Sequence, residues 1–284
     1  MARKIALFLC VLVASIYGLN TFVESKLAKL THDDIYNDCH KVWSARGIYN
    51  SKAEENTLLS IGRAADAGAK GVEVDFFYYP EDDRFYVDHD FLSRDENGVF
   101  LDRGEKPLTL ETLFAEESEL HYWLDYKNVG RMSDAETQKA IARLTKISQV
   151  NNIKERLYIE GSNPLVLGEY TRAGFKTILA MDLLPMENPL SEYLINLYKM
   201  VYYFSDISGV ASRHGALSSH SYNAADTHYD PSIADQLSGI PYFLFHTPDD
   251  ADTLEALAND PTVRVMLVGR DDSINRFDLS ACEK

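Results

Sequence analysis

The sequence has a deficit of positive charge, few cysteines and no long hydrophobic run. Its 284 residues include 44 acidic and 28 basic side chains, which give a formal net charge of −16. An acidic surface repels nucleic-acid phosphates, so we expect no nucleic-acid partner. The same charge is compatible with binding divalent cations. Hydrophobic residues make up 45% of the chain, which allows a sizeable core and argues against disorder of the whole.

The main apolar run lies at the N-terminus and is short. Arg3 and Lys4 precede the apolar residues 5–14, and residues 15–18 follow as Ser-Ile-Tyr-Gly. This order is typical of a secretory signal peptide, and the run is too short for a comfortable membrane span. We therefore expect residues 1–18 to be a signal peptide or, as the alternative, an uncleaved N-terminal membrane anchor. Either reading predicts an exported protein, periplasmic or extracellular.

The remainder, residues 27–284, lacks internal repeats and low-complexity tracts, and we expect it to form a single domain. Strands are predicted at 41–44, 71–79, 85–89, 121–126, 156–160, 177–181, 200–204, 242–245 and 263–268. Helices are predicted at 55–67, 109–117, 133–149, 164–173, 189–198, 232–237 and 249–258. This alternation predicts a parallel α/β sheet, and about eight such strands in about 240 residues favour a closed (β/α)8 TIM barrel. A doubly wound open sheet is the alternative, but no Gly-rich phosphate loop follows the first strand.

The chain has three cysteines, of which Cys10 lies in the leader. Cys39 and Cys282 lie near the two ends of the expected barrel, whose first and last strands are neighbours. An exported protein meets an oxidising compartment. We predict a Cys39–Cys282 disulfide, with two unrelated thiols as the alternative.

Acidic side chains recur at the ends of predicted strands. Glu73 and Asp75 lie two residues apart and therefore point to the same side of a strand with apolar neighbours. Buried like charges need a cation or a shared proton, and Ca²⁺ or Mg²⁺ prefers such oxygen ligands. Asp125 would complete a three-carboxylate metal site, and Lys127 on the same strand face would meet an anionic oxygen. Solvated acids on an edge strand and a simple Asp125–Lys127 ion pair are the alternatives.

Three further side chains fit a site for an anion. His89 ends a short extended run and is a candidate general acid or base, although a lone histidine is more often structural. Arg46 follows the first strand, and its planar guanidinium suits phosphate oxygens. Glu55 begins the first predicted helix of the barrel.

At these positions the sequence resembles the glycerophosphodiester phosphodiesterases, a family of the phospholipase C-like TIM-barrel superfamily. Family members carry His-Arg-Gly, Glu-Asn-Thr, Gly-x-Glu-x-Asp, His-Asp and Glu-x-Lys in this order. The corresponding segments here are Arg46-Gly47, Glu55-Asn56-Thr57, Gly71-Val72-Glu73-Val74-Asp75, His89-Asp90 and Asp125-Tyr126-Lys127. The match covers residues 42–127, and the later chain matches in rhythm only.

The resemblance implies a TIM barrel, a divalent metal ion and hydrolysis of a small phosphodiester or a lipid head group. It implies that Glu73, Asp75 and Asp125 hold the metal. His89 would act at the leaving alkoxide, and Arg46 and Lys127 would hold phosphate oxygens. The resemblance also gives a role to Glu55, which would support Arg46 by an ion pair.

Two departures from the family weaken the expectation of full activity. The first catalytic histidine of the family aligns with Ala45, and Asp125 stands where the family usually has Glu. Loss of one acid–base partner typically costs ~10²–10⁴ in rate. Three hypotheses for the function therefore follow: a slow or altered phosphodiesterase, a metal- and phosphate-binding pseudoenzyme, and a structural or partner-binding domain.

A replacement for the missing histidine is sought among the other histidines. His246, which ends a predicted strand, is preferred as a base and as a substrate-binding residue over His214 and His40. A metal-bound hydroxide is a further alternative. The aromatic run 76–79 could line a head-group pocket, with core packing as the simpler reading.

Overall fold

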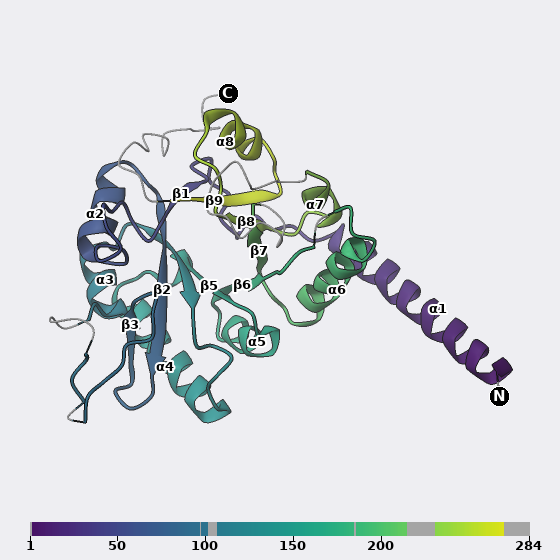
Figure 1. Ribbon diagram of the computed structural model, residues 1–284, viewed down its shortest axis with the longest axis horizontal. Helices are drawn as coiled ribbons and strands as arrows, with labels where there is room; N and C mark the ends of the chain where they lie inside the picture. The colour runs from purple at the N-terminus through teal and green to yellow at the C-terminus, as the bar shows by residue number, and fades with distance from the viewer. Residues whose placement is uncertain (1, 97, 102–106, 185, 215–230, 270–284) are drawn as a thin grey trace.

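Eight parallel strands close into a barrel in the computed structural model (Figure 1). The structure describes residues 2–96, 98–101, 107–184, 186–214 and 231–269. The barrel strands are β1 (Val42–Ala45), β2 (Gly71–Tyr79), β4 (His121–Tyr126), β5 (Leu157–Gly161), β6 (Lys176–Ala180), β7 (Gly209–Arg213), β8 (Tyr242–Phe245) and β9 (Val263–Gly269). Because β1 pairs with both β2 and β9, the eight parallel strands form a closed ring, and the predicted (β/α)8 barrel is confirmed.

Helices follow the strands around the outside of the barrel. They are α2 (Leu58–Asp66), α3 (Leu110–Glu116), α4 (Asp134–Val150), α5 (Pro164–Arg172), α6 (Ser191–Phe204), α7 (Pro231–Gln236), α8 (Ala251–Ala258) and the 3-10 turn η1 (Lys154–Arg156). Thr57, Thr109 and Ser133 cap α2, α3 and α4, because each side chain accepts a hydrogen bond from a first-turn backbone N–H. The short strand β3 (Arg84–Val87) pairs antiparallel with the end of β2 and lies outside the barrel order.

Two hydrophobic layers hold the barrel. The inner layer consists of side chains that point into the barrel, among them Trp43, Trp123, Tyr158 and Phe243. The outer layer lies between the strands and the helices and takes the alternate residues of each strand. The face of a strand residue therefore decides whether it can reach the barrel mouth.

One predicted strand is wrong. Residues 200–204 belong to α6, and the strand that follows is β7, five residues further along the chain and missed by the prediction. The aromatic residues of 200–204 favour a strand, but the buried positions Ser191, Ile195, Lys199 and Tyr202 recur at the spacing of a helix.

The aromatic run Phe76–Tyr79 packs in the core. All four side chains are buried. Phe76 and Tyr78 belong to the outer layer, whereas Phe77 and Tyr79 pack with Tyr86 of β3. The simpler of the two expectations for this run is therefore the correct one.

The N-terminal helix α1 (Ala2–Leu27) projects from the barrel, but its last turns are docked on it (Figure 1). Val23 and Leu27 are buried in the outer layer. Glu24 forms an ion pair with Lys199 of α6 and accepts a hydrogen bond of 2.6 Å from Ser238. No helix in the described part of the chain has the length and apolar character needed to span a bilayer.

Candidate active site

Three acidic side chains from β2 and β4 meet at the C-terminal end of the barrel. Trp123 belongs to the inner layer, so Asp125, two residues later on β4, points to the same side. Asp125 pairs in register with Asp75, which shares its strand face with Glu73. One carboxylate oxygen of each acid lies within 4.8 Å of the other two. The structure thus brings together the acids that the sequence singled out, and their role as metal ligands stays a prediction.

The chemistry of these acids fits a hard divalent cation such as Ca²⁺ or Mg²⁺. Glu73 is buried, and no group in the described part of the chain donates a hydrogen bond to its carboxylate. Burial and the neighbouring Asp75 raise the pKa of Glu73 well above its usual value. Burial also raises the pKa of Asp125, against the opposing effect of Lys127. A doubly charged ion would remove the repulsion from Asp75 that adds to the effect of burial on the pKa of Glu73.

Asp75 is the most firmly held of the three acids. Its Oδ2 lies 2.8 Å from Nε of Arg46 and accepts a hydrogen bond of 2.7 Å from Nδ2 of Asn56. Its Oδ1 lies 2.5 Å from Nζ of Lys127. Asn56 also accepts a hydrogen bond of 3.1 Å from the Asp75 backbone N–H. The sequence prediction gave Asn56 no role, although its place in the Glu-Asn-Thr motif was a signal.

The loop after β1 has the backbone shape that turns Arg46 toward the acids. Arg46 has a φ of 60° and Gly47 a φ of 81°, and the Arg46 N–H donates to the Glu73 carbonyl at 2.9 Å. A Cβ on Gly47 would lie 2.4 Å from the backbone of Ser60, so only glycine fits there. Nη1 of Arg46 lies 3.2 Å from Glu55, as the resemblance implied for this pair.

The neighbouring acids keep Lys127 and Arg46 in their positively charged forms. Burial lowers the pKa of Lys127, but Asp125 and Asp75 raise it above its usual value. Burial likewise lowers the pKa of Arg46, and Asp75, Glu73 and Glu55 raise it more.

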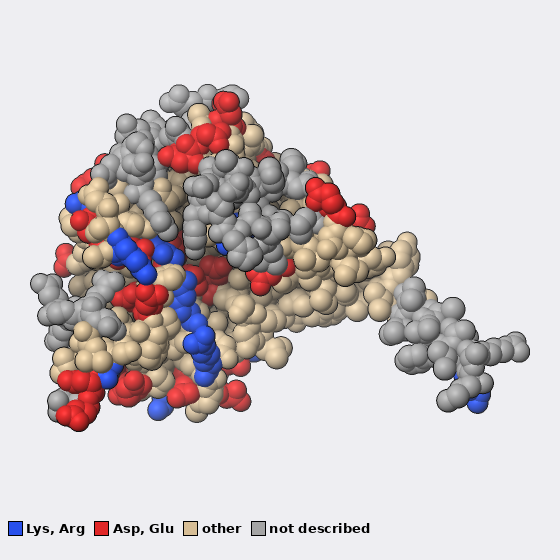
Figure 2. Space-filling view, viewed as in Figure 1, with Lys and Arg blue, Asp and Glu red and all other residues tan. Residues whose placement is uncertain are grey.

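Basic side chains form a band across the viewed face with acidic side chains beside it, although the molecule is acidic as a whole (Figure 2). A face of this kind can accept an anion such as a phosphodiester.

His89 lies in the loop that follows β3. The loop runs beside the end of β2, because the Asp88 N–H donates to the Asp75 carbonyl at 3.0 Å. Nδ1 of His89 lies 2.9 Å from Asp90, which leaves Nε2 for another partner. No contact in the described part of the chain joins this ring to the three acids, so its catalytic role stays a prediction.

Solved structures share this barrel. A glycerophosphodiester phosphodiesterase from Parabacteroides distasonis has a TM-score of 0.55 at 17% identity, over 81% of this chain and 92% of that one. One from Agrobacterium tumefaciens has a TM-score of 0.53 at 14% identity, over 81% and 96%. The fold is that of the glycerophosphodiester phosphodiesterases. No protein-family model and no curated protein matches the sequence.

The resemblance to the glycerophosphodiester phosphodiesterases is thereby confirmed at the level of the fold, and the missing histidine can be placed in that fold. Ala45 pairs in register with Glu73 on one side and with Gly269 on the other. Neither Ala45 nor Gly269 has a side chain that can take or give a proton. Among the described residues, the strand positions level with Glu73 on β1 and β9 therefore hold no acid–base group.

The proposed replacements for that histidine fall at two different ends of the barrel. His246 follows β8 and His214 follows β7, at the C-terminal ends of their strands. His40 precedes β1, so a strand length of ~16 Å separates it from Ala45, and it is wrong as a candidate.

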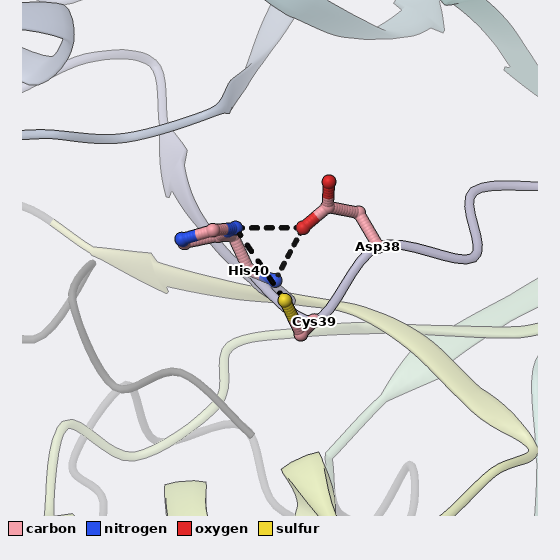
Figure 3. Close-up of side chains that lie close together, drawn as sticks. All are labelled: Asp38, Cys39 and His40. Carbon is pink, nitrogen blue, oxygen red and sulfur yellow. Dashed lines mark hydrogen bonds and ion pairs between the residues drawn. The ribbon is translucent and has the colours of Figure 1, made fainter. Parts of the chain in front are cut away.

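His40 belongs instead to a small cluster at the N-terminal end of the barrel (Figure 3). Its Nδ1 lies 2.6 Å from Asp38, and Sγ of Cys39 lies 3.8 Å away. Cys39 is disulfide-bonded, so its sulfur is no thiolate ligand and the cluster is a poor metal site. Cys282 lies outside the described residues, and the Cys39–Cys282 pairing stays a prediction.

A fourth acid, Glu160, was missed by the sequence prediction. It lies on β5 in register with Asp125 and is 8% exposed. Burial, and next the charge of Asp125, raises the pKa of Glu160 to about 8. A single glutamate between Ile159 and Gly161 at a strand end was the only signal in the sequence.

Proposed function

We propose that the protein is a divalent-metal-dependent phosphoric diester hydrolase that acts on glycerophosphodiesters or related lipid head-group phosphodiesters. The observation that carries this proposal is the meeting of Glu73, Asp75 and Asp125 beside Arg46 and Lys127 at the barrel mouth. Catalytic groups of TIM-barrel enzymes lie at this end of the strands. The shared fold of the glycerophosphodiester phosphodiesterases supports the same reaction class.

Each site residue has a role in the proposed reaction. Arg46 and Lys127 bind oxygens of the phosphate, because both remain cationic. A divalent ion held by the three acids would supply Lewis acidity and charge stabilisation at the phosphate. His89 gives a proton to the leaving alkoxide from Nε2, while Asp90 orients the ring through Nδ1.

Ala45 favours a second candidate function. Without the first histidine the barrel could bind metal and phosphodiester and turn the ligand over slowly or not at all. This second candidate is a catalytically impaired metal- and phosphate-binding pseudoenzyme. A purely structural barrel remains the third reading.

Hydrolysis of glycerophosphocholine, measured with Ca²⁺ or Mg²⁺, tests the choice between enzyme and pseudoenzyme. We expect slow turnover by the wild-type protein and a loss of ~10²-fold or more in His89→Ala. Ala45→His should raise kcat, because it returns an acid–base group beside Glu73. Equal rates for wild type and His89→Ala would remove His89 from the mechanism.

Binding without hydrolysis, seen by calorimetry, would instead establish the pseudoenzyme. Absence of any metal binding, with no rise in the melting temperature by either ion, would favour the structural reading.

We also propose that the protein is exported, with the N-terminus as signal peptide or membrane tether, and that it has no nucleic-acid partner. The basic start of the sequence followed by its apolar run supports export. A tether would keep the barrel near lipid head groups.

A further inference from the structure

Glu160 is a buried carboxyl group at the barrel mouth that the proposed reaction does not use. Its strand position is level with Asp125 on β4, and Asp125 is level with Asp75 on β2. Three neighbouring strands therefore each present an acid at the same register. Glu160 lies on the far side of Asp125 from Asp75, because β4 lies between β2 and β5.

One oxygen of Glu160 has a partner and the other is open. Oε2 accepts a hydrogen bond of 2.5 Å from the indole Nε1 of Trp123. Within the described part of the chain, Oε1 has no hydrogen-bond partner, and it is not among the polar atoms sealed from solvent. A carboxyl group that is more than nine-tenths buried therefore presents one oxygen to the mouth.

The fold accounts for only one oxygen of this acid, the one that accepts from the buried Trp123 N–H. The inward-facing neighbours Tyr158 and Ile178 are apolar or aromatic and belong to the inner layer. An apolar residue would avoid the cost of removing a carboxyl group from water, but it would leave the Trp123 N–H without this acceptor. The bond to Trp123 positions the acid, but that bond uses only one of its two oxygens.

We propose that Glu160 is a specificity-determining residue that hydrogen-bonds a hydroxyl group on the alcohol part of the substrate, with Trp123 as its positioning residue. This inference rests on the proposed function and names the ligand chemistry of the same site. Glu160 offers one directional hydrogen bond, which suits a polyol such as glycerol. Trp123 approaches Glu160 with its N–H edge, and its ring packs edge-to-face on Phe243. Trp123 and Phe243 therefore do not form an aromatic cage for a quaternary ammonium group.

The test compares a substrate that has hydroxyls with one that has none. The ratio of kcat/KM for glycerophosphoglycerol to kcat/KM for bis(4-nitrophenyl) phosphate is measured in wild type, Glu160→Leu and Glu160→Gln. We expect Glu160→Leu to lower this ratio at least about tenfold, because the substrate hydroxyl loses its buried partner. Glu160→Gln should restore most of the ratio, since an amide also donates and accepts.

Equal loss on both substrates would show that Glu160 supports the barrel or the metal site, and an unchanged ratio would show no contact with the hydroxyl. A larger loss on glycerophosphoethanolamine than on glycerophosphoglycerol would assign the position to an ammonium group instead.

Failure of the proposed function can be told apart from failure of this inference. If the wild-type protein hydrolyses no diester, calorimetry with Mg²⁺ compares the binding of glycerol 3-phosphate with that of inorganic phosphate. The hydroxyl site predicts tighter binding of glycerol 3-phosphate, and loss of that preference in Glu160→Leu. If wild type and Glu160→Leu each bind glycerol 3-phosphate and inorganic phosphate with equal affinity, that result alone would overturn the inference.

Discussion

Lys127 shows how the site balances charge at the scale of single residues. Its ammonium group contacts both Asp75 and Asp125, two of the three acids expected to hold the metal. The acids here, with Glu55 beside Arg46, outnumber the two cations before any metal binds. A divalent ion and Lys127 therefore compete for the same oxygens.

Lys127→Met should strengthen metal binding and lower the stability of the metal-free protein. Removing one positive charge from the edge of the site leaves more negative charge for the incoming ion, so we expect Mg²⁺ affinity to rise about tenfold or more. The measurement is calorimetric titration with MgCl₂ in the absence of substrate. Lys52→Met is the matched control, because Lys52 is exposed and pairs with Asp90 outside the three acids. Unchanged or weaker Mg²⁺ binding by Lys127→Met would contradict the competition.

At the scale of elements, α1 is divided between a projecting part and a docked part. Exposed apolar side chains such as Ile16 and Tyr17 lie on the projecting part, whereas Val23 and Leu27 are buried. Lys199 is almost fully buried, and burial lowers its pKa to about 8. Glu24 pairs with this lysine.

A chain that begins at residue 19 should be as stable as the full chain, and a chain that begins at residue 28 should not. The shorter chain loses two buried apolar side chains and leaves Lys199 without Glu24, changes that typically cost ~2–5 kcal/mol each. Urea unfolding of the three proteins is the measurement. Equal midpoints for the chains that begin at residues 19 and 28 would show that the docked part contributes nothing.

The elements also show where local sequence signals succeed and where they fail. The bounds predicted for β2 and β4 agree with the structure, because both strands are dense in β-branched and aromatic residues between turn signals. The segment 200–204 has the same composition but lies in α6, where helical spacing buries one face against the barrel. Composition alone cannot distinguish these cases, since the deciding contact is with residues distant in the chain.

At the scale of the whole molecule, stability should depend on pH through the buried acids. The pKa of Glu160 is raised to about 8 by burial and by Asp125, from ~4.3 in an unfolded chain. Between these values the folded protein binds more protons than the unfolded chain, so this group makes the free energy of unfolding fall as pH rises.

Glu160→Gln should remove that contribution. Relative to wild type, the variant is expected to gain stability as the pH is raised from 5 to 8, because its amide does not ionise. Urea unfolding at both pH values, with a chelator present, measures the difference. A constant difference between variant and wild type at the two pH values would show that Glu160 titrates normally in the folded protein.

The sequence by itself determined the barrel and the presence of three acids on two strands, because alternation along a strand and the order of strands and helices are local properties. It also indicated Ala45 as a departure from the glycerophosphodiester phosphodiesterases. Only the tertiary structure decided that Asn56 holds Asp75 and that Glu160 joins the row of acids. It also decided that His40 lies at the wrong end of the barrel. These relations depend on the register between neighbouring strands and on contacts between side chains distant in the chain, which local sequence patterns do not specify.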